Sequence, residues 1–150
     1  MKIKEIPSKQ TLPLRSEILR PGKNISTCMF EGDDAPDTRH FGAMDEQENI
    51  VGVVSVYRKG HPAIQQESAW QIRAMATSAA YRGQGIGLSL LVSAENYARE
   101  SGGLVIWANA RSSAIGFYAK AGYSVISEEF MIDGVGPHYL VMKPLDSQGK

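Results

Sequence analysis

Polar and apolar positions in the first half of the chain predict strands interrupted by one helical segment. Strict alternation in KIKEI (residues 2–6) indicates a first strand. Residues 8–19 carry apolar side chains at helical spacing, although Pro13 complicates the helix start, and LRPG ends the helix. Residues 40–44 and 49–57 predict a hairpin that is joined by the polar turn DEQEN.

The second half predicts a unit of strand, loop, helix and strand. Residues 69–77 alternate as a strand does, and residues 86–98 place their apolar side chains at helical spacing until the pair Gly102–Gly103 ends the helix. LVIWAN (residues 104–109) is an almost continuous apolar run, which is typical of a buried strand at the centre of a sheet. The remaining predicted elements are a short helix from Ser112 or Ser113 to Lys120, a strand over 123–130, a turn over 133–136 and a last strand over 138–145.

Composition bounds the class of protein. The chain has 150 residues, 43% of them hydrophobic, which is enough for one domain with a core of its own. Sixteen basic and sixteen acidic residues cancel, so a strongly basic nucleic-acid binder is not expected. The single cysteine, Cys28, permits no internal disulfide, and with three scattered histidines it predicts no metal site.

The N-terminal sequence MKIKEIPSKQ lacks the apolar core of a signal peptide. No apolar run approaches the roughly 18 residues that a membrane span requires. We therefore expect a cytoplasmic protein with no membrane partner.

The stretch YRGQGIG, residues 81–87, places three glycines between a predicted strand and a predicted helix. Backbone N–H groups and the helix dipole make such a junction an anion site, and a pyrophosphate suits it. The spacing fits neither the dinucleotide fingerprint, whose third glycine is missing, nor a Walker loop, whose lysine is missing. A tight turn with glycines for packing remains the alternative.

Two segments resemble motifs of the GCN5-related N-acetyltransferases. RGQGIG resembles the R/Q-x-x-G-x-G/A loop of that family, and NARSSAIGFYAKAGY (residues 109–123) resembles its N-x-x-A-x-x-F-Y-x-K-x-G-F/Y segment. The resemblance covers residues 69–123 well and, in element order, the whole chain. It implies a single-domain α/β (α+β) fold with a mixed, mostly antiparallel sheet, helices on both faces, and a splayed parallel strand pair in the centre.

The resemblance implies acetyl-CoA as cosubstrate and names the residues that bind it. Backbone groups of the splayed strand would bind the pantetheine arm and those of the glycine loop the pyrophosphate. Asn109 would contact the pantetheine or cap its own strand, and Arg82 would pair with a phosphate or remain solvated. The residues assigned to the cofactor are Met75, Ala76, Thr77, Arg82, Gly83, Gln84, Gly85, Ile86, Gly87, Asn109, Phe117 and Lys120.

The resemblance also assigns roles in acetyl transfer to an amine. Tyr118 matches the family's tyrosine beside the thioester sulfur and would be the general acid. His138 is our candidate base, since the GPHYLVM tail and a TRH segment (residues 38–40) resemble the ElaA-like bacterial branch. The open alternatives for the base are His40, Glu67, Glu128, Glu129 and a water chain.

Several further assignments follow from residue type. Trp70 and Trp107 are expected in the core, and Arg73 either binds an anionic substrate group or, as we favour, pairs with a carboxylate. Direct transfer to a small-molecule amine is the leading function. A non-catalytic acyl-CoA-binding module and a protein lysine or N-terminal acetyltransferase are the alternatives, with an acidic groove expected for a lysine acceptor. A homodimer through the apolar last strand is expected by analogy.

Overall fold

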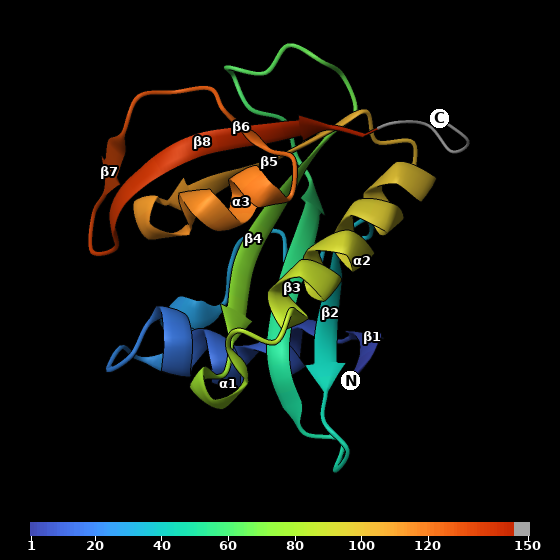
Figure 1. The fold of residues 1–150 in the computed structure, drawn as a ribbon, viewed down its shortest axis with the longest axis vertical. Helices are drawn as coiled ribbons and strands as arrows, with labels where there is room; N and C mark the ends of the chain where they lie inside the picture. Colours follow the sequence, from blue (N-terminus) through green and yellow to red (C-terminus); the bar gives the residue numbers. More distant parts are fainter. Residues whose placement is uncertain (146–150) are drawn as a thin grey trace.

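A computed structural model describes residues 1–145 of the chain and contains one eight-stranded sheet (Figure 1). The strand order is β1-β2-β3-β4-β5-β8-β6, with β7 paired to β8. Only β4 and β5 run parallel, and every other pair is antiparallel. The predicted fold, a mostly antiparallel sheet with one central parallel pair, is confirmed.

The first four strands form a meander. They are β1 (Lys2–Ile6), β2 (Arg39–Met44), β3 (Ile50–Arg58) and β4 (Ala69–Thr77). The β2–β3 hairpin is confirmed, and its turn is fixed because the Asp45 carboxylate accepts the backbone N–H groups of Gln47 and Asn49. Strand β3 is buried from Val51 to Tyr57, since both faces of the sheet are covered there.

The predicted N-terminal helix is helical but irregular. It consists of a 3₁₀ turn (Ser8–Thr11), α1 (Leu12–Leu14) and a π turn (Arg15–Leu19) in which Arg20 N–H donates to the Arg15 carbonyl at 3.0 Å. Pro13 sits in the first turn of α1, where its missing N–H costs little. A further 3₁₀ turn covers Ile25–Cys28, and Cys28 is fully buried there, as a small apolar residue would be.

The second half contains the longest helix. A 3₁₀ turn (Ala79–Tyr81) precedes α2 (Ile86–Glu100), and β5 (Val105–Arg111) follows the helix. A second 3₁₀ turn (Ser112–Ala114) leads into α3 (Ile115–Lys120). Three strands follow, β6 (Ser124–Val125), β7 (Phe130–Ile132) and β8 (Gly136–Pro144).

The prediction of one strand over 123–130 is wrong. Only two of those residues pair as β6, and the next pairing begins at Phe130. The strand breaks because the Ser127 hydroxyl takes the place of a backbone acceptor and receives the Leu140 N–H at 2.9 Å. The prediction for residues 104–109 is two residues too short, since β5 continues to Arg111.

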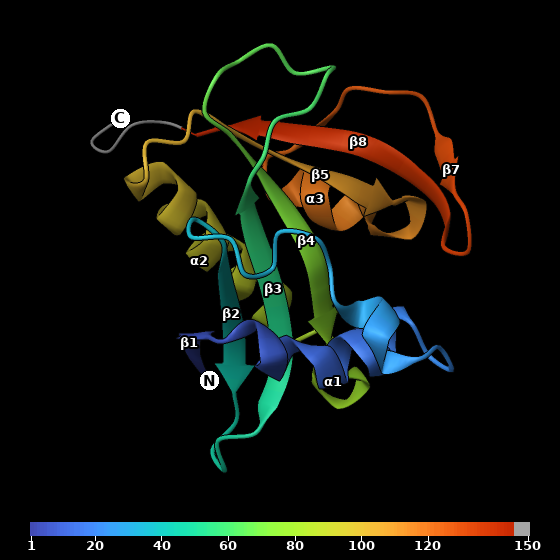
Figure 2. The same ribbon diagram turned by 180° about the vertical axis from the view of Figure 1, so that it is seen from behind.

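Helices cover both faces of the sheet. In the view of Figure 1, α2 and α3 lie in front of the sheet, and Figure 2 shows the N-terminal helical segment on the opposite face. The α2 side holds the largest core, in which Trp70, Leu90 and Ile106 are almost fully buried. Trp107 is buried on the other face, so both tryptophans are core residues as predicted.

A buried polar contact fixes α2 against β8. The Tyr123 hydroxyl donates to Glu95 Oε2 at 2.6 Å, and Lys143 Nζ lies 3.2 Å from Glu95 Oε1. Burial and the neighbouring Glu95 carboxylate raise the pKa of Tyr123, so the phenol keeps its proton. This contact holds the helix in place and thereby fixes the position of its N-terminus.

Within residues 1–145, no helix is both long enough and apolar enough to span a membrane.

Candidate functional site

The parallel strands β4 and β5 diverge and leave a cleft. They pair only over Ala69–Val105, Trp70–Ile106 and Gln71–Trp107, after which β4 continues beside β3 and β5 continues beside β8. Figure 1 shows the two halves of the sheet splaying apart beyond this point. A cleft of about 920 Å³ opens between them. Backbone groups on the open edge of β4 are therefore available to a bound molecule.

A bulge in β4 marks the floor of the cleft. The register changes between Ser55–Arg73 and Val53–Ala76, so two residues of β4, Ala74 and Met75, oppose one residue of β3. Ala74 has φ of 59°, a conformation that costs a non-glycine residue about 1–3 kcal/mol. Such bulges re-aim the backbone beside functional sites, and Ala74 and Met75 both line the cleft.

The glycine loop closes one end of the cleft. Gly83 and Gly85 both have φ of 80°, which favours glycine, and a Cβ atom built on either would meet nothing within 4 Å. The two glycines therefore allow the turn that leads into α2, and they line the cleft without a side chain that would narrow it. Helix α2 starts directly after Gly85 and has no acidic residue in its first turn, so its N-terminal N–H groups face the cleft without a competing carboxylate.

Most of the residues predicted to bind the cofactor line this one cleft. They are Met75, Ala76, Thr77, Arg82, Gly83, Gly85, Ile86, Gly87, Asn109 and Phe117. Gln84 and Lys120 are exposed and do not line it. Both catalytic candidates, Tyr118 and His138, are also among the lining residues.

Tyr118 is buried in the wall formed by α3. Its ring packs edge-on against Phe117 and Tyr123, with centroids 5.2 Å away in both cases. Burial raises the pKa of Tyr118 to about 12. The phenol is therefore protonated at neutral pH and is held as a proton donor.

His138 lies on β8 with a defined tautomer. Its Nδ1 lies 2.8 Å from the Gly136 carbonyl oxygen, which only accepts, so Nδ1 carries the proton and Nε2 keeps its lone pair. The ring stacks on Phe130 at 6.1 Å and is almost fully buried. The arrangement places the imidazole beside the cleft with Nδ1 held by the backbone, so Nε2 is the ring nitrogen left for proton transfer.

The alternative bases lie outside the cleft. Among the residues that the structure describes, no aspartate or glutamate lines it, and Glu67, Glu128 and Glu129 are therefore absent from the lining. His40 is buried among protein groups: its Nε2 donates to the Asp33 carbonyl at 2.9 Å, and its Nδ1 accepts from the Ser55 hydroxyl at 2.6 Å. Burial lowers the pKa of His40, so the ring is a neutral structural group.

The network around His40 is centred on a buried ion pair. Arg15 and Asp33 make two contacts, at 2.7 and 3.1 Å, and Arg15 also donates to the Cys28 carbonyl, the Ser55 hydroxyl and the Tyr57 hydroxyl. Burial raises the pKa of Asp33, but the bonds from Arg15 and Tyr57 outweigh it and leave that pKa below its usual value. This network fixes residues 28–33 against β3 and so positions Phe30 at the cleft.

Three arginines beside Phe30 and His138 form the feature that sequence analysis missed as a group. Arg73 lies over the Phe30 ring at 4.4 Å, Arg20 lies 5.5 Å from the same ring, and Arg111 is the backbone partner of His138 across β5 and β8. The favoured pairing of Arg73 with a carboxylate is wrong, because no such ion pair exists within residues 1–145. The sequence does contain these three arginines, but nothing in the spacing of positions 20, 73 and 111 indicates that they come together in the fold.

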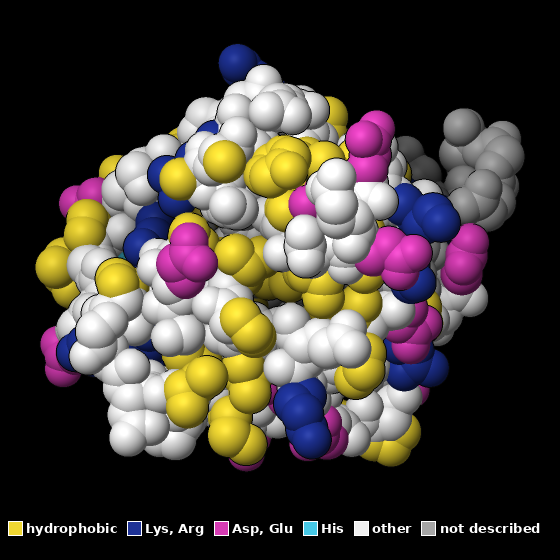
Figure 3. All heavy atoms as spheres, turned by 90° about the horizontal axis from the view of Figure 1, so that it is seen from below, with side chains coloured by type: hydrophobic (Ala, Val, Ile, Leu, Met, Phe, Trp, Pro, Cys, Tyr) yellow, Lys and Arg dark blue, Asp and Glu magenta, His cyan; other side chains and the backbone are white. Residues whose placement is uncertain are grey.

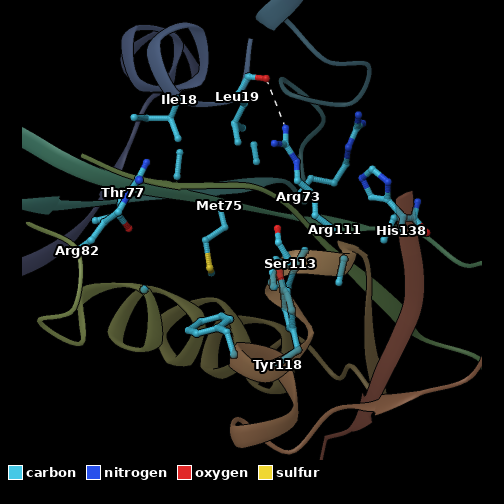
Figure 4. A pocket seen from close by; sticks show the side chains of 18 of the residues that line it. Ile18, Leu19, Arg73, Met75, Thr77, Arg82, Arg111, Ser113, Tyr118 and His138 are labelled. Atoms are coloured by element: carbon cyan, nitrogen blue, oxygen red, sulfur yellow. Dashed lines mark hydrogen bonds between the residues drawn. The ribbon is translucent and has the colours of Figure 1, made fainter. Parts of the chain in front are cut away.

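The cleft therefore has two ends with different chemistry. We call residues 75–77 and 82–87 the loop end, and we call Arg20, Phe30, Arg73, Arg111 and His138 the arginine end. In Figure 4, Thr77 and Arg82 lie on one side of the cleft and Arg73, Arg111 and His138 on the other, with Met75 between them. From below, hydrophobic side chains surround a hollow near the centre of the molecule, with Lys or Arg side chains to its left (Figure 3).

No group of three or more potential metal-ligating side chains occurs in the described part of the chain.

Comparison with known proteins gives the family from the sequence and the same fold from solved structures. Residues 9–123 match the acetyltransferase (GNAT) family. The chain is 34% identical over 145 residues to YitI of Bacillus subtilis (strain 168), an uncharacterized N-acetyltransferase, and the match covers 97% of each chain.

Solved structures agree with this match at the level of the fold. An aminoglycoside 6'-N-acetyltransferase complexed with coenzyme A has a TM-score of 0.77 at 16% identity, and the alignment covers 100% of each chain. A GCN5-related N-acetyltransferase from Kribbella flavida has a TM-score of 0.73 at 19% identity, with 96% of this chain and 97% of the other covered. At such identities the structures establish the fold and nothing beyond it.

Proposed function

The chain belongs to the GNAT family of acetyltransferases and is an acetyl-CoA-dependent N-acetyltransferase, and from that premise we propose that it transfers the acetyl group directly to a primary amine of a small molecule. The transfer takes place in a ternary complex. Cys28, which alone could carry an acyl group as a thioester, is buried outside the cleft, and this supports a direct route.

The loop end binds the cofactor. Backbone N–H groups of the glycine loop and the first turn of α2 hold the pyrophosphate, and Arg82 adds a charged donor. The pantetheine arm runs along the open edge of β4, where residues 75–77 have no partner strand on the β5 side. The observation that carries this proposal is the position of the glycine loop, which lines the cleft together with the N-terminus of α2 and the open edge of β4.

Acetyl transfer needs a base, an oxyanion site and an acid. His138 Nε2 takes a proton from the amine, which then attacks the thioester carbonyl. A backbone N–H at the bulge of β4, beside Ala74, stabilises the oxyanion. Tyr118 donates its proton to the sulfur as the C–S bond breaks, so that coenzyme A leaves as a thiol.

The experiment measures thiol release from acetyl-CoA with a panel of amines, for wild type and for Tyr118→Phe. We expect turnover with at least one class of amine and a strong loss in the variant. Tyr139→Phe is the matched control, since Tyr139 lies on β8 outside the cleft lining and its loss should leave the rate unchanged. Equal rates for wild type and Tyr118→Phe would refute the role of Tyr118.

The assignment to the ElaA-like branch and the homodimer both remain predictions. The ElaA-like branch is not tested by any of the comparisons. A homodimer through the last strand is also untested, and β8 already has neighbours on both of its edges, β5 on one and β6 and β7 on the other.

A further inference from the structure

The arginine end carries charge that no protein group balances. The whole chain has sixteen basic and sixteen acidic residues, yet within residues 1–145 the cleft is lined by four arginines and by no aspartate or glutamate. Arg82 belongs to the loop end, which leaves Arg20, Arg73 and Arg111 together at the other end. Among residues 1–145, none of these three has a carboxylate partner, whereas the nearby Arg15 is neutralised by Asp33.

The three guanidinium groups are held in place by contacts that leave their charge available. Arg20 and Arg73 rest on Phe30, and Arg111 has one long hydrogen bond of 3.4 Å to the Leu19 carbonyl, drawn as a dashed line in Figure 4. All three side chains are half-buried. Like charges this close repel one another, and an anion placed between them would relieve that repulsion. A guanidinium fork matches carboxylate and phosphate oxygens.

Gln71 supplies a second recognition point on the same face of β4. It lies two residues before Arg73, lines the cleft and is 5% exposed. Its side-chain oxygen is buried and, within the described residues, has no hydrogen-bond partner. A buried acceptor without a partner is costly, and the N–H of a bound amine would satisfy it.

We propose that the acceptor is a primary amine that also carries a carboxylate or phosphate group, with the anion held by Arg73, Arg111 and Arg20 and the amine directed by Gln71 and His138. This inference rests on the proposed function and narrows it to one substrate class. A polycationic acceptor would meet only repulsion at the arginine end. A lysine side chain was expected to need an acidic groove, and no acidic residue of the described part of the chain lines the cleft.

The test is isothermal titration of matched amines into protein saturated with coenzyme A. The pairs are phosphoethanolamine against ethanolamine and β-alanine against its amide, with kanamycin as the polycation. We expect the anionic member of at least one pair to bind at least about tenfold more tightly than its neutral partner. Tighter binding of phosphoethanolamine than of ethanolamine identifies a phosphate site, and tighter binding of β-alanine than of its amide identifies a carboxylate site.

Variants distinguish binding of the anion at these arginines from a general effect of the protein's positive charge. Arg73→Gln and Arg111→Gln should each weaken the anionic probe about tenfold while leaving coenzyme A affinity unchanged. Arg58→Gln is the matched control, because Arg58 is exposed on β3, outside the cleft. Gln71→Leu should weaken binding of the amines and leave inorganic phosphate binding intact.

Neutral amines binding as well as their anionic partners, or kanamycin binding best, would overturn the inference. Thiol release with the same panel then distinguishes the two claims. Release with neutral amines would overturn the substrate class but leave the acetyltransferase in place, whereas a protein that does not bind acetyl-CoA at all would overturn the proposed function itself.

Discussion

The two ends of the cleft present different groups to a ligand. The loop end uses backbone N–H groups from one continuous stretch of chain, residues 82–87, and the start of α2. The arginine end offers side chains from five separate segments, which contribute Arg20, Phe30, Arg73 with Gln71, Arg111, and His138.

This difference explains how one end can be common to a family while the other is specific. Backbone N–H groups at a helix N-terminus bind any pyrophosphate, and they need only glycines and a correctly placed helix. Side chains on separate segments can be replaced one at a time, so the acceptor can change without disturbing the cofactor. We therefore expect that a substitution at one end can weaken binding there without weakening binding at the other end.

The largest effect is expected on the free energy of unfolding, when the buried Arg15–Asp33 ion pair behind the arginine end is broken. Arg15→Met removes one partner of the buried ion pair and leaves Asp33 uncompensated, which should lower the free energy of unfolding by about 3–5 kcal/mol. Arg39→Met is the control, because its ion pair with Glu5 is partly exposed and should contribute about 0–1 kcal/mol. Urea unfolding measures both. A loss for Arg15→Met no larger than the control's would show that the network does not support this end.

Tyr118 lies between the two ends and should affect only the chemical step. Tyr118→Phe should lower kcat about 10²- to 10⁴-fold while the affinity for acetyl-CoA stays within about twofold. Because burial raises the pKa of Tyr118 to about 12, no loss of activity from its ionisation is expected anywhere in the range from pH 6 to about 10. Stopped-time thiol release at saturating acetyl-CoA measures kcat. An equal loss of cofactor affinity would place the residue in binding rather than in acid catalysis.

His138 should give a loss that depends on pH. His138→Gln removes the group that accepts the amine proton, and we expect a rate about 10²-fold lower at pH 7. The loss should shrink as the pH rises, because the amine then loses its proton to solvent before it binds. The control is His61→Gln, since His61 contacts Trp107 outside the cleft. A deficit that is constant across the pH range would contradict a role as base.

The smallest effect concerns acid stability of the network behind the arginine end. The folded pKa of His40 lies below 6.5 and that of Asp33 below 3.8, so both groups contribute stability that is complete above those values. The free energy of unfolding should fall as the pH drops below about 6.5, where unfolded His40 gains a proton that the folded state resists, and fall further below about 4. In His40→Gln the first part of this decline should disappear, and its persistence would exclude His40 as the source.

The sequence predicted the local geometry of the loop end but not the assembly of the arginine end, for a physical reason. Gly83, Gly85 and Tyr118 lie in contiguous motifs whose local conformation is set by the residues themselves, so the motif predicted the geometry. The arginine end depends on the π turn at residues 15–19 and on the contacts of Arg15 with Asp33 and Ser55, which join positions 18 and 40 residues apart. His138 was found through a motif, whereas Gln71 carried no signal beyond its position on a strand.

The break in the predicted strand at residues 123–130 has a similar origin. Ser127 looks like an ordinary polar position in an alternating pattern, and only its hydrogen bond with Leu140 N–H on β8 ends the pairing. Strand β8 follows at Gly136 and places His138 at the cleft. Contacts between distant segments thus determine the parts of the site that the local sequence pattern could not predict.

The most direct test of the two-ended cleft is titration of acetyl-CoA into wild type, Gly85→Val and Arg73→Gln. Valine at Gly85 would have to adopt φ of 80° and would extend into the space above the loop, so affinity should fall about 100-fold or more. Gly60→Val is the control, because Gly60 is equally open but does not line the cleft. Arg73→Gln should bind acetyl-CoA as wild type does. Retained affinity in Gly85→Val, or a comparable loss in Arg73→Gln, would contradict the division of the cleft into a cofactor end and an acceptor end.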